Sequence, residues 1–453
     1  MAAKSSISSG ILFTDRRDFY IQPAVVNELF QDITPFTTLM GSLGSVSVED
    51  PVFKQFEYRN AWLDQYVVTP SSGALDTSGA IDSTVSLVCA KATPGLGRNS
   101  AGVSEWNERE LASPSFDSSA VGLLLQYSSG DNILNLKVTG VSSSASTTLL
   151  CVILAKVGTV ATIPVNARVD VIGSVFDEGG VAPDASSDDI SVIWGRTQIM
   201  KTSIEVTGTL YHMALRGYSD ELARLRSEKM KEHKIQKEKT FLLGIDPKRS
   251  VYSEALVAAS DAGTRYTAGV IPSILKFGTA YNTSTSNSAG RKANVFSVTN
   301  ATSPGANDVK TFDQFIGMTE NLFATIPSSS ESRVLFCGAG LISHFSNPGL
   351  ALYTDSSFQL TEPVKGQYGF NVRKLVTPHG EINLVHAPVL RGNWRNYGVM
   401  VDTDYVKQYT FRPTTYQANI KTDNAYDGVK DQIMSDEGIG LSMLEKHAVI
   451  KVV

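Results

Sequence analysis

Six histidines are the first candidates for metal binding or acid–base chemistry, because imidazole titrates near neutral pH and is a common metal ligand. They are His212, His233, His344, His379, His386 and His447. No HxH or HExxH spacing occurs among them, and only His379 and His386, which flank one predicted hairpin strand, could share a side of an element. We therefore interpret the histidines as packing or surface residues and predict no metal site.

Glycine and serine patterns give little support for phosphate binding or nucleophilic catalysis. Neither a GxxxxGK[ST] loop nor a GxSxG elbow is present. Gly338 and Gly340, in GAGLISHFSN between a predicted strand and a helix, are weakly similar to a dinucleotide turn, but the third glycine is missing. Paired acids in DEGG and SDDIS are typical of turns, and the sequence leaves a glycosidase pair open without favouring one. We predict no catalytic residue and no cofactor.

Three cysteines, Cys89, Cys151 and Cys337, are too few and too far apart for a disulfide framework or a zinc site. They favour buried thiols in a reducing compartment. The N-terminal stretch lacks the apolar region of a signal peptide, and no apolar run is long enough to cross a bilayer. We therefore expect a chain that is made and kept in the cytoplasm, without a membrane partner.

The most unusual stretch is a heavily charged segment, GYSDELARLRSEKMKEHKIQKEKTFLLG, in a chain of 453 residues that is only 19% charged and has a net charge of −5. It predicts a long helix over residues 219–244. Ser219 is a favourable N-cap, Asp220 follows in the first turn, and Gly244 suits the position just after the last turn. At 1.5 Å per residue the helix would be a rod of roughly 37 Å.

The charges of this helix would suit nucleic-acid binding only if the basic ones formed a separate face. The basic residues are Arg224, Arg226, Lys229, Lys231, Lys234, Lys237 and Lys239. The acidic residues Asp220, Glu221, Glu228, Glu232 and Glu238 are interspersed among them. Arg224 stands four residues before Glu228, so the two can pair on the helix surface. Lys234 has the same spacing to Glu238. Intermixed signs argue against a dedicated DNA face.

The apolar stripe of the helix is thin. Its predicted members are Leu222, Leu225, Met230 and Phe241. Ile235 and Leu242 fall off this stripe at 100° per residue. Such a helix is either solvated or a rod that bridges several contacts.

The rest of the chain predicts an α+β protein. Residues 1–50 form an arm with an amphipathic piece from Pro23 and a second short turn in TPFTTLMGSLG. Short apolar or alternating runs between about 114 and 182, separated by Ser-rich turns, indicate a small inserted β domain at the tip of an extended β arm. After Ser250, helical and strand patterns alternate as in a mixed α/β domain, and the chain ends in a predicted strand from His447.

This order of segments resembles a tailed-bacteriophage major capsid protein with the Hong Kong 97-type fold. The stretches that carry the resemblance are DITPFTTLMGSLG, WGRTQIMKTSIEVTGT leading into DELARLRSEKMKEHKIQKEKTFLLG, and ARVDVIGSVFDEGGVAP. The resemblance covers nearly the whole chain and implies five regions. They are an N-arm at 1–50, an extended loop at 51–215 carrying the insertion at about 114–182, a peripheral domain at 216–264 with the spine helix 219–244, an axial domain at 265–400, and a return to the peripheral domain at 401–453.

The implied function is self-assembly into hexamers and pentamers of a shell around double-stranded DNA, with no enzymatic activity. Segments that cannot bury their apolar side chains within one subunit must pack against neighbouring subunits. Heterologous contacts of this kind, repeated around a symmetry axis, close into rings. The implied partners are a portal, a scaffolding protein, a decoration protein, and packaged DNA through weak nonspecific contact. The implied location is the virion, after assembly in the cytoplasm of a bacterial host. The minimal fold lacks the insertion, whose role stays open.

Two alternatives remain from the sequence alone. One is an encapsulin-like compartment, which would hold cargo enzymes, or another self-assembling phage structural protein. The other is a carbohydrate-binding protein built around the β insertion, although the insertion is poor in the aromatic residues that such a groove would need.

Overall fold

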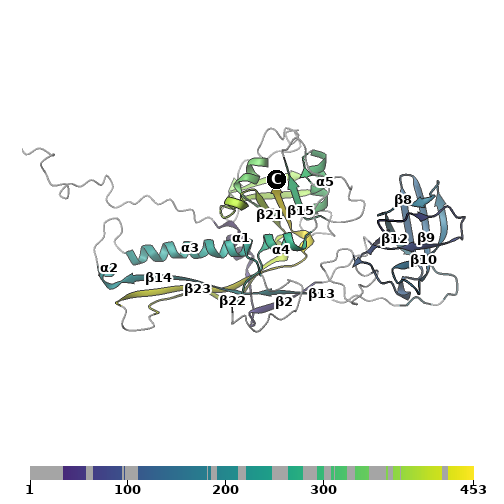
Figure 1. Ribbon diagram of the computed structural model, residues 1–453. Helices are drawn as coiled ribbons and strands as arrows, with labels where there is room; N and C mark the ends of the chain where they lie inside the picture. The colour runs from purple at the N-terminus through teal and green to yellow at the C-terminus, as the bar shows by residue number, and fades with distance from the viewer. Residues whose placement is uncertain are drawn as a thin grey trace, which may run out of the picture. The chain divides into compact units, whose positions relative to one another are not determined.

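The computed structural model describes residues 34–57, 65–93, 96, 111–180, 182–184, 191–212, 221–246, 264–278, 293–299, 308–310, 312–323, 332–345, 364–365, 371–377, 379–420 and 427–453. Its elements include both helices and sheets, which confirms the α+β prediction (Figure 1). One compact unit comprises Met200–Gln236 and Thr414–Ser435, and a second comprises Thr34–Ile199, Lys237–Pro413 and Asp436–Val453. The predicted helix from Pro23 to residue 34 lies outside the described residues.

The long helix and a four-stranded sheet are the elements around which the polar contacts are built. The helix α3 spans Glu221–Leu243, close to the predicted 219–244, and its predicted cap Ser219 lies outside the described residues. The sheet has the order β1-β22-β23-β14. Its strands are β1 (Ser45–Ser47), β22 (Val406–Gln417), β23 (Gly428–Leu441) and β14 (Gln198–Thr207), and α2 (Gly208–His212) follows β14.

Within the first unit, α3 packs on β14 and β23 through a small apolar cluster, and Figure 1 shows the helix running alongside both strands. The cluster contains Ile204, Val206, Leu222 and Ile433. On β14 every second residue is buried, the pattern of a strand with one face toward a core. The predicted stripe is confirmed at Leu222 and Phe241, but Leu242, predicted to lie off it, is fully buried as well.

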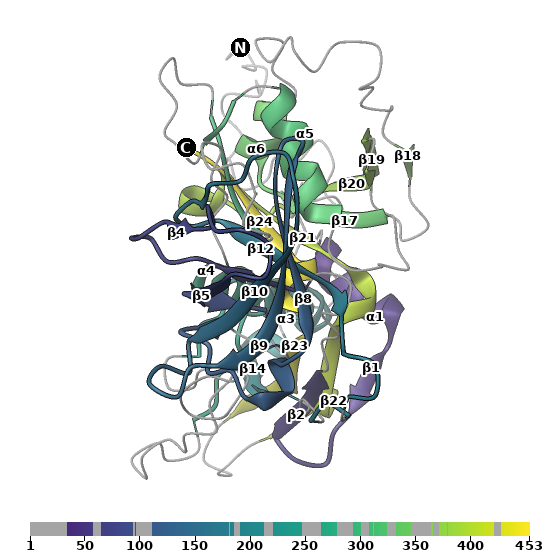
Figure 2. The same ribbon diagram turned by 90° about the vertical axis from the view of Figure 1, so that its right-hand side faces the viewer.

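A second sheet of eight strands forms the β insertion. Its order is β5-β10-β9-β8-β12-β3-β6-β7, and β8, β9, β10 and β12 can be followed in Figure 2. The strands are β3 (Tyr66–Val68), β5 (Thr84–Val88), β6 (Lys91–Ala92), β7 (Leu111–Ala112), β8 (Leu123–Ser129), β9 (Asn132–Val141), β10 (Thr148–Val157) and β12 (Arg168–Ser174), and a separate pair joins β4 (Leu75–Asp76) to β11 (Thr162–Ile163). The sheet thus takes in strands from Tyr66 onward, well before residue 114.

The third large sheet carries the mixed α/β part of the chain. Its order is β16-β15-β24-β21-β17-β20-β19-β18. Its strands are β15 (Val295–Val298), β16 (Asp308–Val309), β17 (Ser332–Cys337), β18 (Val364–Lys365), β19 (Asn371–Thr377), β20 (Gly380–His386), β21 (Tyr397–Val401) and β24 (Ala448–Val452). The helices are α4 (Val270–Phe277), α5 (Phe312–Phe323) and α6 (Ala339–Phe345). The predicted hairpin around PHGE is β19–β20, with Thr377 opposite Gly380.

Two further strands form a separate two-stranded ribbon. It joins β2 (Val52–Glu57) to β13 (Ser191–Arg196) in antiparallel register. β2 and β3 follow each other along the chain but belong to different sheets. Phe53 stacks on Tyr409 with ring centroids 4.0 Å apart, so one face of the ribbon is anchored. A Cβ at Gly195 would lie 2.2 Å from the Phe53 ring, which explains the glycine.

Candidate functional site: polar contacts along the long helix

Acidic and hydroxyl side chains of β23 face the helix and its neighbours from a buried position. Asp431, Ser435, Asp436 and Glu437 are all buried, although acidic residues are rarely buried without partners. A buried charge needs both a counter-charge and hydrogen bonds, because leaving water costs several kcal/mol per ion. The partners of each group therefore define the site.

In the first unit, Asp431 accepts hydrogen bonds from α3, from β22 and from the loop that follows β22. Its Oδ2 accepts from Arg226 Nη2 at 2.8 Å and from the Tyr416 hydroxyl, and its Oδ1 accepts from the Asn419 N–H at 2.8 Å. Burial alone would raise the pKa of Asp431, but the bonds from Tyr416, Asn419 and Arg226 outweigh it and hold the pKa below its usual value. Asp431 is therefore an ionised anchor for α3 and the end of β22.

Two turns further along α3, His233 is buried between two hydroxyl groups. Its Nδ1 lies 3.0 Å from Thr202 Oγ1 on β14, and its Nε2 lies 2.9 Å from Ser435 Oγ on β23. A hydroxyl can donate or accept, so this pair satisfies both ring nitrogens of a neutral imidazole. The histidine ties the helix to two strands and serves packing, as the sequence predicted for histidines in general.

In the second unit, two basic groups meet Asp436. Arg265 Nη2 lies 2.7 Å and Arg412 Nη2 lies 3.1 Å from its Oδ2. Two guanidinium groups on one buried carboxylate leave this cluster with a net positive charge.

The neighbouring Glu437 pairs with the end of the long helix. Its carboxylate contacts Lys237 Nζ and accepts from Gln408 Nε2 at 2.9 Å. Asp436 and Glu437, adjacent in sequence, thereby engage different partners.

Most predicted basic residues of the helix are ion-paired inside the molecule. Arg224 Nη1 lies 2.5 Å from Glu228 Oε1, which confirms that predicted pair. Lys229 Nζ lies 2.6 Å from Glu232 Oε2. Glu238, predicted to pair with Lys234, is instead fully buried and accepts from the N–H and the Oγ1 of Thr37, each at 3.2 Å. With Arg226, which pairs with Asp431, and Lys237, which pairs with Glu437, four of the seven predicted basic residues form ion pairs within the subunit.

The weak dinucleotide pattern is explained by chain packing. The Gly338 N–H donates to the Tyr397 carbonyl and the Gly340 N–H to the Arg395 carbonyl, each at 2.9 Å. These donors are therefore not available to a phosphate. A Cβ at Gly338 would lie 2.3 Å from the Arg395 oxygen, so the glycine permits this close approach.

The structure does not bring the remaining candidates together. His379 and His386 lie at opposite ends of their hairpin strand, both exposed, and His212 is exposed on α2. Among the described residues no group of three or more His, Cys, Asp or Glu could hold a metal ion. The three thiols are free and buried, and burial raises the pKa of Cys151 to about 12 and those of Cys89 and Cys337 further.

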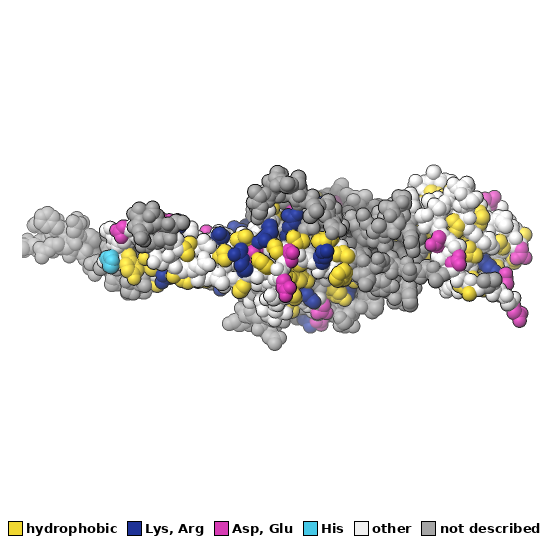
Figure 3. Space-filling view, turned by 90° about the horizontal axis from the view of Figure 1, so that it is seen from below, with side chains coloured by type: hydrophobic (Ala, Val, Ile, Leu, Met, Phe, Trp, Pro, Cys, Tyr) yellow, Lys and Arg dark blue, Asp and Glu magenta, His cyan; other side chains and the backbone are white. Residues whose placement is uncertain are grey.

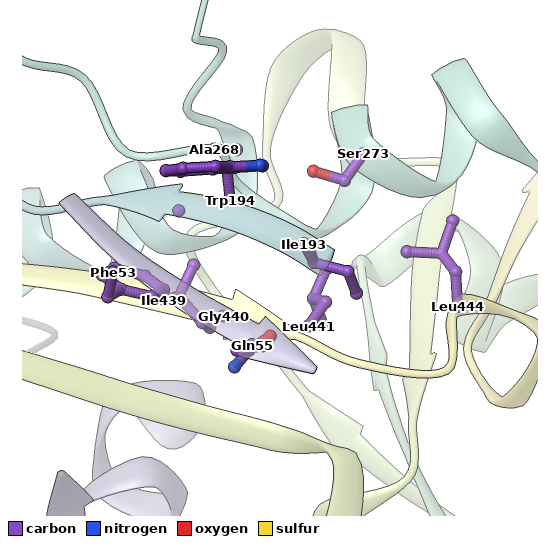
Figure 4. A pocket seen from close by; sticks show the side chains of 11 residues that line it. Phe53, Gln55, Ile193, Trp194, Ala268, Ser273, Ile439, Gly440, Leu441 and Leu444 are labelled. Carbon is purple, nitrogen blue, oxygen red and sulfur yellow. The ribbon is translucent and has the colours of Figure 1, made fainter. Parts of the chain in front are cut away.

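One small cavity lies among β2, β13, α4 and β23, lined mostly by apolar side chains such as Phe53, Trp194 and Leu444 (Figure 4). It measures about 20 Å³, room for a water molecule but not for a cofactor. Among the helices that the structure describes, none combines the length and the apolar character needed to cross a membrane.

The sequence reasoning missed the acidic partners on β23. The available signal was the stretch KDQIMSDEGIGL, in which acids interrupt an apolar strand while the distant helix carries an excess of basic residues. Complementary charge on two buried elements is a reason to pair them. The remote partner of Glu238 leaves no comparable trace in the sequence, because Thr37 is an ordinary residue 201 positions away.

Comparison with known proteins gives one family. A family model described as SU10 major capsid protein matches residues 23–453. A search of curated proteins gave no match.

Among solved structures, the chain is similar to one from Mycobacterium phage Bobi (TM-score 0.44, 7% identity, 99% of both chains covered). It is also similar to the cyanophage A-1(L) capsid (TM-score 0.40, 12% identity, 62% of this chain and 84% of that one). A third similar structure is an encapsulin complex from Synechococcus elongatus (TM-score 0.36, 8% identity, 59% of this chain and 77% of that one).

Proposed function

The chain belongs to the SU10 major capsid protein family, and we therefore propose that it builds a phage head from hexamers and pentamers that enclose double-stranded DNA. As a member of this family it is a structural protein of the virion and not an enzyme. The match over residues 23–453 is the observation that carries the proposal, because it spans the arm, the long helix and the closing strands together.

We assign the regions of the capsid subunit as the sequence suggested them. Residues 1–50 are the N-arm, 51–215 the extended loop with its insertion, 216–264 the peripheral domain, 265–400 the axial domain and 401–453 the return. Support for this comes from the sheets: β1 of the arm and β22 and β23 of the return join one sheet with β14, next to which α3 packs. The insertion has a hydrophobic core of its own.

Self-association is supported by the outward face of the β2–β13 ribbon, which we define as Lys54, Phe56 and Val192. Phe56 has 71% of its side chain exposed. Lys54 Nζ lies 4.0 Å from the Trp194 ring centroid. In Figure 3, Lys and Arg side chains gather close to hydrophobic ones on one face of the molecule. A two-stranded ribbon is marginal in water by itself, so an apolar outward face favours cover by a second copy.

The partners and the site of assembly belong to the same proposal. We expect a portal, a separate scaffolding protein and a decoration protein, with assembly in the cytoplasm of the bacterial host. Contact with packaged DNA would be weak and directed at its backbone, since Arg224, Lys229 and Lys237 are already paired within the subunit.

The test is the assembly state of the purified full-length chain. Negative-stain microscopy should show closed shells or capsomer rings, and light scattering should report masses far above that of one chain. Addition of DNA at increasing salt separates weak nonspecific binding from a dedicated site, because the first is lost steeply as salt rises. A monodisperse monomer across concentrations and salts would contradict the proposal, and cargo enzymes inside DNA-free shells would favour the encapsulin-like alternative.

A further inference from the structure

The short helix α1 (Pro35–Leu43) begins without a cap of its own. Its N-cap residue Thr34 makes no side-chain bond to the first turn, and the first turn holds no acidic residue. The first N–H groups of a helix need an acceptor from elsewhere when they are buried. Glu238 of α3 supplies it, because its Oε2 accepts from the backbone N–H and from the hydroxyl of Thr37.

Glu238 is in an unusual position for a carboxyl group. Its neighbours on α3, Lys234 and Lys239, are exposed, whereas Glu238 has no exposed surface. Its Oε1 is buried without a hydrogen-bond partner. Two buried oxygens with donors on one of them suit a neutral carboxyl better than a carboxylate, because a carboxylate needs donors to both oxygens to offset the loss of water.

No opposite charge faces Glu238 among the described residues packed around it. The helix α1, PFTTLMGSL, contains no charged residue. The lysine next to Glu238, Lys237, is paired with Glu437 on β23. α1 also makes an apolar contact, in which Phe36 packs edge-on against Phe336 of β17 with ring centroids 5.3 Å apart. Protonation of Glu238 therefore removes the free-energy cost of burying its charge.

We propose that Glu238 is a proton-controlled latch that holds α1 on the end of α3, tightest when the carboxyl is protonated and looser when it ionises. The proposal concerns contacts within one chain and does not depend on the proposed function. In a shell, the docking of the N-arm, which contains α1, would then depend on pH.

The direction of the pH response follows from proton linkage. Burial raises the pKa of docked Glu238 to about 7, against 4.5 for an exposed glutamate, although the bonds from Thr37 favour the charged form. The docked state thus binds the proton more tightly than the released state. Docking is strongest below pH 4.5 and weakens as pH rises from there through 7. Between pH 6 and pH 8 the docking equilibrium should weaken about tenfold.

Hydrogen exchange of the full-length chain, measured by mass spectrometry on peptides that cover α1, tests this. After correction for the intrinsic pH dependence with an unstructured reference peptide, α1 in the wild type should be about tenfold better protected at pH 6 than at pH 8. Glu238→Gln keeps an acceptor for Thr37 but cannot ionise, so its protection should be the same at both pH values.

Glu232→Gln is the matched control, because Glu232 lies on the same helix on a half-exposed turn. It should keep the tenfold difference. Equal protection of the wild type at pH 6 and pH 8, or a pH response that survives in Glu238→Gln, would overturn the proposal. If Glu238→Gln fails to fold, infrared spectra of the wild type decide instead. A protonated carboxyl band present at pH 6 and lost by pH 8 supports the latch, and its absence at pH 6 overturns it.

Discussion

At the scale of single residues, His447 shows how burial fixes one protonation state. The ring is fully buried, its Nδ1 accepts from the Asp402 N–H at 3.2 Å, and its Nε2 lies 3.1 Å from the Ser442 carbonyl oxygen. Only a neutral imidazole with its proton on Nε2 satisfies both contacts. Burial, together with the charge of Arg333, lowers the pKa of His447 to about 4.

A pH dependence of stability follows from His447. A histidine with a lowered folded pKa contributes stability that is complete above its unfolded pKa of about 6.5 and is lost as pH falls toward 4. We expect denaturant unfolding of the wild type to lose up to about 3 kcal/mol of unfolding free energy over this window relative to His447→Gln. His379→Gln, at an exposed turn, should keep the wild-type slope. Parallel pH profiles for wild type and His447→Gln would contradict this account.

At the scale of elements, β9 of the insertion shows a strict alternation between core and surface. Leu134, Leu136 and Val138 are fully buried, while Asn135 and Lys137 between them are half-buried. Leu136 lies opposite Leu125 on β8 and Ile153 on β10, so its side chain is surrounded by apolar neighbours of two adjacent strands. The insertion therefore derives its stability from a core of its own.

Truncation within that core should be costly. We expect Leu136→Ala to lower the free energy of unfolding of the insertion by about 2–5 kcal/mol, because it removes transfer energy and leaves a cavity. Lys137→Ala, one residue along, breaks an ion pair with the exposed Asp177, which water screens, and should cost clearly less. Thermal unfolding of the two variants measures the difference. Equal costs would show that the observed packing does not stabilise the insertion.

Which elements could be predicted depended on how local their signals are. The long helix, β17 and the hairpin β19–β20 carry their periodicity and turn residues within a few positions, and each was placed from the sequence. The break between β2 and β3 could not be predicted, because both strands read as one apolar alternation and separate only through their distant partners β13 and β12. Leu242 was misjudged for the same reason, since tertiary packing widens the buried face at the end of α3.

At the scale of the whole molecule, the order of segments carried more information than any motif. The resemblance to a tailed-phage major capsid protein is confirmed by the family match. The contacts that hold the polar residues in place were beyond sequence reasoning, because Asp431, Asp436 and Glu437 find their partners across more than one element. Interfaces between subunits are even harder to predict from the sequence, since they depend on faces that one chain leaves uncovered.

The face of the β2–β13 ribbon gives the prediction that belongs to the assembled molecule. Phe56→Asp places a charge on a surface that would become apolar interface, and burying an unpaired charge costs far more than the exposed phenylalanine contributes within one subunit. We expect Phe56→Asp to fold normally by circular dichroism yet to shift the chain from shells or rings to small species in light scattering. Val157→Asp is the matched control, because Val157 at the end of β10 is also more than half exposed, at 57%. If Val157→Asp blocks assembly while Phe56→Asp does not, the insertion and not the ribbon is the surface that joins subunits.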